Sequence, residues 1–131
     1  MVIAHPNASP IRRYQDLRVW QASMELVVEI YRASESFPKR ETYGLTAQCR
    51  RAAVSLPSNI AEGHGRKHLS DYLHQLSVAN GSLMELETQI LIAGRLGYLP
   101  ADERDILLAR TSDVGRMLAG LIAALKRRRV K

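Results

Sequence analysis

Residues 72–97 read YLHQLSVANGSLMELETQILIAGRLG, and the periodicity of this stretch points to a helical architecture. Its apolar residues recur at alternating steps of three and four, which is the spacing of a coiled-coil seam. They are Tyr72, Leu76, Ala79, Leu83, Leu86, Ile90, Ala93 and Gly97. The pair Asn80-Gly81 is typical of a turn, but the seam passes through it without a change of phase. We therefore predict one long helix from about Ser70, in which Gly81 lies with Ala79 and Ser82 where a neighbouring helix approaches closely.

Three further amphipathic segments flank this stretch, and none has the alternation of a strand. The first helix is expected to follow Asp16, which belongs to the residue types favoured at N-caps. The second is expected to open at Glu41 or Thr42 and to end at residues 63–65, where a glycine can adopt the left-handed conformation. The last is expected to start at Pro100. The core residues expected on these three helices are Leu17, Trp20, Met24, Val27, Val28 and Tyr31, then Leu45, Cys49, Ala52, Ala53, Leu56 and Ile60, and finally Leu107, Val114, Leu118, Leu121 and Leu125.

Four such helices joined by short loops predict an all-α fold, an antiparallel up-down-up-down four-helix bundle. We expect the bundle to span residues 16–125, between a disordered lead-in over residues 1–15 and a basic tail over residues 126–131. Further apolar residues lie outside the core stripes, and they widen the apolar arcs beyond what three neighbouring helices can cover. They are Val19, Val28, Leu73, Leu91, Ile92, Ile106, Leu108 and Ile122. This width predicts a homo-oligomer, and a monomer with scattered surface aliphatics is the alternative.

The net charge of +6 is concentrated at the ends of the chain. Five of the cations lie in the last six residues, and Arg12 and Arg13 lie near the other end. The part between residues 16 and 125 is nearly neutral, with twelve basic and thirteen acidic residues. The basic C-terminal tail has two readings, a solvated tail and a phosphate-binding segment.

Several classes of protein are disfavoured by the composition. No apolar run approaches the roughly 18 residues needed to cross a bilayer, so no membrane partner is expected. Residues 1–10 lack the charged and apolar regions of a secretory signal. The single cysteine, Cys49, has no partner for an internal disulfide, which fits a reducing compartment. We therefore expect a cytoplasmic protein.

No pattern of catalytic or cofactor-binding residues is present. His64 and His68 are four residues apart, with His74 and Glu62 nearby, a spacing that could hold a metal on a continuous helix. His64 lies between two glycines in an expected loop, however, so a solvated loop is the preferred reading. Cys49 lies on a core stripe and is expected to be a buried, inert thiol. We predict neither a metal nor a cofactor, and no enzyme activity.

A polar line runs beside the apolar stripe of the second helix, and Ser82, Glu85 and Gln89 follow matching steps on the third. If the two lines face each other, Arg51, Glu62 and Glu85 can form an interior charged network. The residues proposed for this structural network are Arg51, Asn59, Glu62 and Glu85. Such a network fixes helix register or a subunit contact, and a polar ligand site is the alternative.

Several stretches of the sequence resemble one known family. The most specific is QCRRAAVSLPSNIAEG at residues 48–63, followed by Arg66. Others are Leu17-Arg18-Val19-Trp20, Phe37-Pro38, Tyr43-Gly44-Leu45, Glu85-Leu86-Glu87-Thr88 and Leu96-Gly97-Tyr98-Leu99. Over about residues 16–126 the chain looks like the four-helix-bundle protein encoded in intervening sequences of bacterial 23S ribosomal RNA genes. One departure is Cys49, where an aliphatic residue is usual.

The resemblance implies a ring-like homopentamer with no established enzymatic activity. Relatives of that family include the accessory protein of diversity-generating retroelements, a basic pentamer that binds a reverse transcriptase and RNA. The nearly neutral body of this chain departs from that relative.

Two functions follow as hypotheses. In the first, RNA or another nucleic acid binds without base readout to basic side chains gathered by oligomerisation. The residues expected to contact phosphates are Lys126, Arg127, Arg128, Arg129 and Lys131, helped by Arg12, Arg13, Arg66 and Lys67. In the alternative, the oligomer is a protein-interaction scaffold, such as an accessory subunit of a reverse transcriptase, with no direct nucleic-acid binding.

Overall fold

The computed structural model describes residues 12–130, and the side chains of residues 12–128. Four α-helices make up most of this part: α1 (Arg18–Ser34), α2 (Leu45–His64), α3 (Leu69–Arg95) and α4 (Ala101–Val130). Two short 3-10 turns, η1 (Tyr14–Asp16) and η2 (Lys39–Glu41), precede α1 and α2. The described residues contain no strand, so the predicted all-α helical bundle is confirmed.

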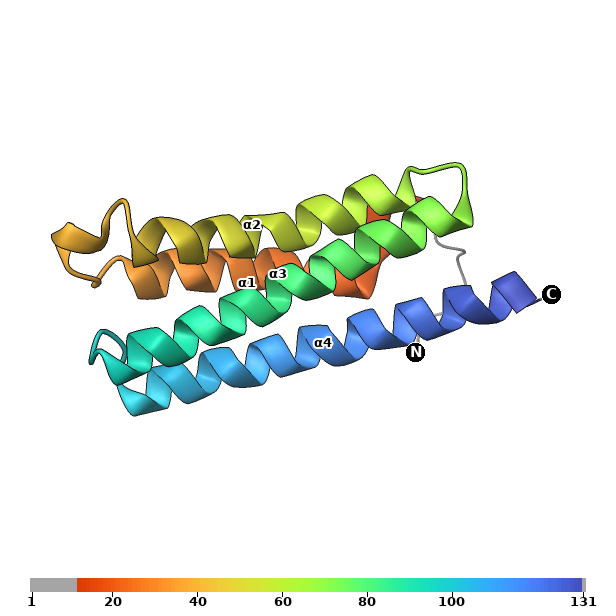
Figure 1. Cartoon of the computed structure of the whole chain (residues 1–131). Coiled ribbons are helices and arrows are strands. Elements are labelled where there is room, and N and C mark those ends of the chain that lie inside the picture. Colours follow the sequence, from red (N-terminus) through yellow and green to blue (C-terminus); the bar gives the residue numbers. More distant parts are fainter. Residues whose placement is uncertain (1–11, 131) are drawn as a thin grey trace.

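The helices lie in two layers, α1 beside α2 and α3 beside α4 (Figure 1). Contacts between α2 and α3, and between α1 and α4, join the layers. In Figure 1, α1 and α3 run in one direction, and α2 and α4 run in the other. The start of α1, the loop between α2 and α3, and the C-terminal end of α4 therefore lie at one end of the bundle.

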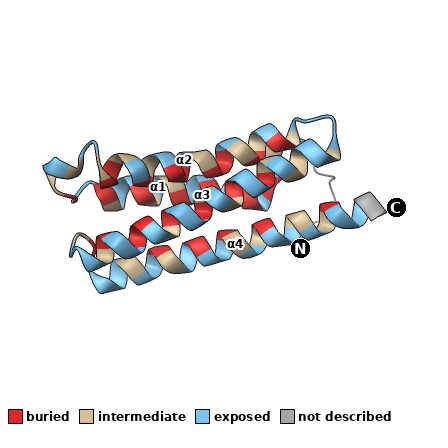
Figure 2. Ribbon diagram, in the orientation of Figure 1, coloured by how far each residue is buried: buried red, intermediate tan, exposed pale blue. Residues whose placement is uncertain are grey.

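The core lies between the two layers, and it uses most of the residues expected on α2, α3 and α4 (Figure 2). On α2 and α3 the small residues Ala52, Ala53 and Ala79 are buried, which lets the two backbones come close. Larger side chains fill the space around them. The fully buried ones include Leu56, Ile60, Leu76, Leu86, Ile90 and Leu118.

The predicted core face of α1 is partly wrong. Leu17 is buried and Trp20 and Val27 pack against the core, as expected, but Val19, expected outside the core stripe, is buried as well. Leu26 and Ile30 are buried, while Met24, Val28 and Tyr31 are each more than 40% exposed. The core side also includes Ser23 and Ser34, which the apolar pattern does not single out. A serine can be buried there because its hydroxyl bonds the preceding turn of the helix: the Ser23 hydroxyl donates to the carbonyl of Val19 at 2.7 Å. α1 thus has two apolar faces, and the one with the larger residues points outward.

Two acidic side chains organise the chain ahead of α1 and α2. Asp16 is not the N-cap of α1, because its carboxylate accepts the backbone N–H groups of Arg12 and Arg13 and closes η1 instead. Glu41 stands four residues before the first residue of α2, and its carboxylate accepts the N–H of Leu45 at 3.0 Å. That bond satisfies one of the backbone donors that a helix start leaves unpaired.

The glycine predictions are corrected by the packing. Gly81 is exposed, and a Cβ built there would meet nothing within 4 Å, so no helix of the same chain approaches it. The close approach is at Gly63, where a Cβ would lie 2.9 Å from atoms of both Tyr72 and Gln75 on α3. Gly65 does not adopt the left-handed conformation after α2, since its φ is −81°. Gly97 does so after α3, with a φ of +79°.

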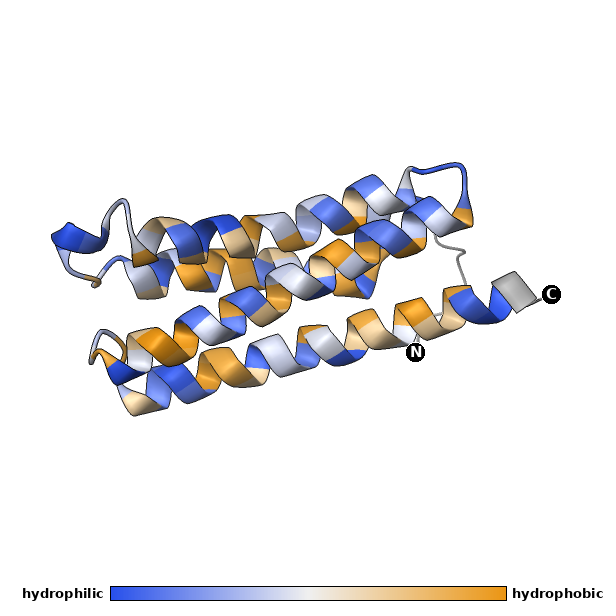
Figure 3. Cartoon of the chain, viewed as in Figure 1, coloured by the Kyte–Doolittle hydropathy of each residue, from blue (hydrophilic) through white to orange (hydrophobic). Residues whose placement is uncertain are grey.

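The last helix continues into the basic tail. α4 extends to Val130, so Lys126, Arg127 and Arg128 belong to its last turns. Figure 3 shows this end of α4 and the α2–α3 loop as hydrophilic, next to apolar turns. Among the described residues, none of the helices combines the length and the apolar character that crossing a membrane requires.

Candidate nucleic-acid interface

The fold brings the sequence-predicted cations of three separate segments to one end of the bundle (Figure 1). Arg12 and Arg13 precede α1, Arg66 and Lys67 lie in the α2–α3 loop, and the remaining ones are on the last turns of α4. All seven described side chains are exposed: Arg12, Arg13, Arg66, Lys67, Lys126, Arg127 and Arg128. We call this set the basic end. Lys131 and the side chain of Arg129, also predicted to contact phosphates, lie outside the described residues.

Two observations indicate that these segments lie near one another. Tyr14 of η1 and Ala61 of α2 line the same groove, so the start of the described chain lies beside the end of α2. At the start of α3, burial raises the pKa of Tyr72, and the positive charge of Arg128 lowers it in part. Arg128 on α4 is therefore close enough to Tyr72 to influence its charge.

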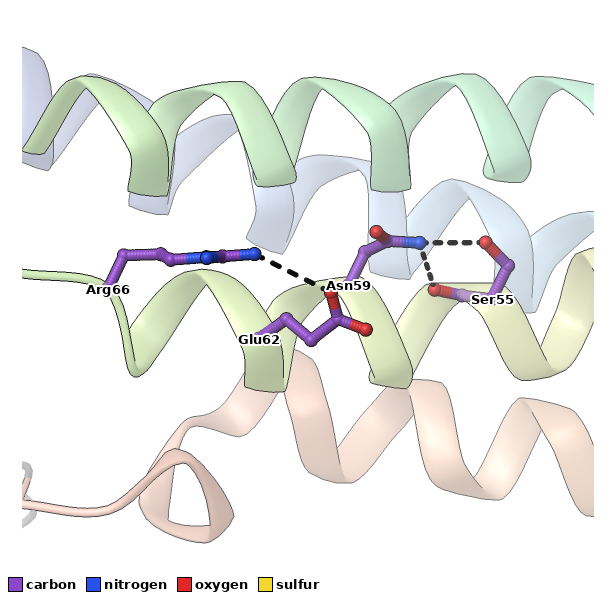
Figure 4. Close-up of polar contacts among 4 residues, drawn as sticks. All are labelled: Ser55, Asn59, Glu62 and Arg66. Atoms are coloured by element: carbon purple, nitrogen blue, oxygen red, sulfur yellow. Dashed lines mark hydrogen bonds and ion pairs between the residues drawn. The ribbon is translucent and has the colours of Figure 1, made fainter.

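Three carboxylates lie near the seven described cations of the basic end: Asp16 in η1, Glu62 on α2 and Asp71 on α3. Arg66 lies 4.0 Å from Glu62, one turn earlier on α2, and both side chains are about half exposed (Figure 4). An exposed pair at this distance is weak, with a typical contribution of about 0–1 kcal/mol. The pair therefore holds Arg66 only weakly.

The opposite end of the bundle has a different charge balance. Its cations Lys39, Arg40, Arg95 and Arg104 lie near Glu35, Glu41, Asp102, Glu103 and Asp105. Arg104 also bonds Asp105 directly, at 2.9 Å. The bundle is thus electrostatically polar along its length, with excess positive charge at the basic end alone.

The interior charged network does not form within one chain. Arg51, Glu62 and Glu85 are all exposed, and no ion pair joins any two of them. The reason is that α2 and α3 meet through small and apolar residues, which leaves the charged side chains on the outer edges of the contact. Glu62 pairs with Arg66 instead.

A smaller, uncharged polar contact joins α2 to α3 in its place. The hydroxyls of Ser55 and Ser82 are 2.8 Å apart across the two helices. The side-chain amide of Asn59 donates to both the carbonyl and the hydroxyl of Ser55, each at 2.8 Å (Figure 4). Of the proposed network residues, only Asn59 takes part in this contact.

The outer side of α2 has a wide groove of about 820 Å³. Arg51 and Glu85 both line it, and so does Tyr43, whose side chain is almost fully exposed. At its α1 edge the guanidinium of Arg50 stacks 4.6 Å from the ring centre of Tyr31 and donates to the Ser34 hydroxyl. Sequence reasoning did not single out Tyr43, although an aromatic residue directly before Gly44 in a loop is a usable signal of exposure.

The groups that might have carried other chemistry are in unreactive surroundings. Cys49 is buried, as predicted, and burial raises the pKa of its thiol to about 11 despite an opposing effect of Arg50. His64 packs edge-on against Tyr72 at the end of α2. Within residues 12–128, no group of three or more His, Cys, Asp or Glu side chains is placed to hold a metal ion.

Comparisons with known proteins agree with this fold. A family model described as "23S rRNA-intervening sequence protein" matches residues 15–120. A solved structure from Bacteroides thetaiotaomicron, described as a protein of unknown function from the S23 ribosomal protein family, superposes with a TM-score of 0.74. It is 19% identical, over 80% of this chain and 95% of that one, so this likeness concerns the fold. No curated protein matches the chain.

Proposed function

We propose that this chain, which belongs to the 23S rRNA-intervening sequence protein family, is a non-enzymatic homo-oligomer that binds RNA through the basic ends of its subunits. The observation that carries the proposal is the gathering of cations from three separate segments at one end of the bundle. Phosphates are the natural ligands of such a surface, because binding releases the counterions condensed on the nucleic acid.

The proposed assembly is a pentameric ring. Met24, Val28 and Tyr31 are exposed on α1, and Met84 and Leu91 are exposed on α3. Large exposed apolar side chains on two separate helices support association of subunits. In a ring whose axis runs along the helices, every basic end faces the same side. Five basic ends would then form one positively charged face, which suits the phosphate backbone of a folded RNA better than a single subunit does.

The interaction is proposed to be independent of sequence. Basic side chains that contact phosphates position a nucleic acid but carry no base readout. The buried Cys49 thiol, with its raised pKa, supports a role without covalent catalysis. We place this function in the cytoplasm, where an unpaired cysteine stays reduced.

A protein-interaction scaffold is the second candidate function. The exposed ring of Tyr43 and the groove beside Arg51 favour it, because tyrosine and arginine are enriched at protein interfaces. A reverse transcriptase is the kind of partner considered for this role. In that case the oligomer would bind its partner with little dependence on the basic end.

The test is RNA binding over a salt series, with Lys126, Arg127 and Arg128 all changed to glutamine. Each lost phosphate contact lowers the slope of log K against log salt by about 0.7 for single-stranded RNA. A matched control changes Lys39, Arg40 and Arg95 to glutamine at the opposite end, which removes the same charge. We expect the first variant to bind more weakly with a shallower slope, and the control to behave as wild type. Equal losses in both variants, or none in either, contradict RNA binding at the basic end.

A further inference from the structure

The outward face of α1 carries a row of residues at the spacing of a coiled-coil seam. The row, here called the α1 seam, consists of Trp20, Met24, Val27 and Tyr31, at steps of four, three and four. Met24 and Tyr31 are each 41% exposed, and the other two are half-buried. The seam borders a groove of about 370 Å³ between α1 and α2 that no charged side chain lines.

The outward face of α3 carries a second row with the same steps. This α3 seam consists of Ser77, Gly81, Met84 and Thr88, all exposed. A glycine inside an exposed helix costs about 1 kcal/mol relative to alanine. No contact among the described residues explains Gly81, because a Cβ there would meet nothing within 4 Å. The α3 seam is likewise free of charge.

The two seams lie at the same height along the bundle. Glu29 of α1 and Glu87 of α3 reach adjacent residues of α4, Arg110 at 3.5 Å and Thr111 at 3.4 Å. A second route runs through α2, where Arg50 stacks on Tyr31 and Ser55 bonds Ser82. Both routes align the two seams to within about one turn, a rise of roughly 5 Å. Since α1 and α3 also run in the same direction (Figure 1), their seams match in order.

Matched in this way, the seams are complementary in size. At the alignment midway between the two routes, Trp20 lies opposite Ser77, Met24 opposite Gly81, and Tyr31 opposite Thr88. A large side chain on α1 then faces a small one on α3. At the remaining level the sizes are reversed, with Val27 opposite Met84. Alternating large and small residues across facing positions is how helices interdigitate at native density.

We infer that α3 of a second copy of this chain lies in the groove between α1 and α2, with its α3 seam against the α1 seam. If neighbouring subunits are related by rotation about an axis parallel to the helices, each residue keeps its position along that axis. The α1 seam of one subunit then meets the α3 seam of the next at the same level, in a head-to-tail contact that can close into a ring. Gly81 of the partner subunit then leaves space for Met24. The inference rests on the proposed homo-oligomer and specifies its contact surfaces. Two uncharged seams fit each other, whereas a nucleic acid would require cations there.

The experiment compares Gly81→Leu with Gly120→Leu by light scattering. Gly120 is a matched control, because it is also exposed, helical and free of neighbours within 4 Å. A Cβ at either position meets no described atom within 4 Å, and circular dichroism checks that each leucine variant folds. Trp20 is the single tryptophan, so acrylamide quenching reports directly on the α1 seam.

We expect G81L to fall to the mass of one chain with Trp20 more readily quenched, while G120L keeps the wild-type mass and quenching. An oligomeric G81L with wild-type quenching overturns this contact but leaves the homo-oligomer intact. Dissociation of both variants also overturns it, since the effect is then not specific to the seam. If wild type has the mass of a single chain and its Trp20 is freely quenched, the face is open to other partners. That outcome overturns the oligomer and the contact together.

Discussion

Replacing Gly63 with alanine tests whether α3 is held in close contact with α2 next to the loop that carries Arg66 and Lys67. A Cβ at Gly63 would lie 2.9 Å from Tyr72 Cδ1 and 2.9 Å from Gln75 Cβ, distances that force α3 to shift. Overpacking of this kind typically costs about 1–3 kcal/mol. Alanine returns about 1 kcal/mol of helix propensity, so a net loss of about 0–2 kcal/mol is expected.

The assay is urea unfolding followed by circular dichroism, with all variants at one protein concentration because association adds to apparent stability. Gly120→Ala is the control, since its new Cβ meets open space and the variant should gain up to about 1 kcal/mol. The reasoning fails if Gly63→Ala is stabilised as Gly120→Ala is, because α3 would then not be held against α2 at this point.

Three further predictions concern two ionisable groups. With the pKa of Cys49 at about 11, roughly one thiol in a thousand is ionised at pH 8. A thiol reagent should therefore label the folded chain far more slowly than the urea-unfolded chain. Similar labelling rates would contradict burial of the thiol. Because the pKa of this thiol is higher in the folded chain than in the unfolded chain, the neutral thiol contributes stability below its unfolded-state pKa. That contribution is lost as the pH rises towards 11. The decline of Tm over this pH range should therefore be flatter in Cys49→Ala than in wild type. The pKa of Glu41 is lowered by the N–H of Leu45 and then by the hydroxyl of Tyr98, so its contribution is present above its ordinary pKa and lost as the pH falls. Tm should therefore drop less steeply with acid in Glu41→Gln than in wild type, and parallel curves would show that the carboxylate is not involved.

The sequence predicts the long helices and most of their core faces because a single stripe marks each of them. On α2, all of the expected residues from Leu45 to Ile60 are buried. On α3, the expected core stripe from Leu76 to Ala93 is buried, whereas the α3 seam on the other face is exposed. Helix α1 was misread because it has two apolar faces. Periodicity identifies both faces, but it does not tell which one meets the chain's own core. The large side chains of Trp20 and Tyr31 make their face look more hydrophobic than the buried face, which includes small serines.

The positions of glycines and charges were harder to predict. Gly63 and Gly81 are both helical glycines, and only the three-dimensional packing shows that α3 lies against the first and nothing lies against the second. Likewise, Arg51 and Glu85 have the spacing of an inward polar line, but the small residues beside them make the contact. The sequence names the cations of the basic end as phosphate contacts, which stays a prediction, and their gathering from three segments depends on the direction in which each helix runs.

The mass of the wild-type protein in solution, measured by light scattering over a range of concentrations, tests the central proposal most directly. We expect a particle of five chains of 14.7 kDa each, stable to dilution and unaffected by removal of nucleic acid. A folded protein that keeps the mass of one chain even at high concentration would contradict the ring, and with it the positively charged face that five basic ends were proposed to form.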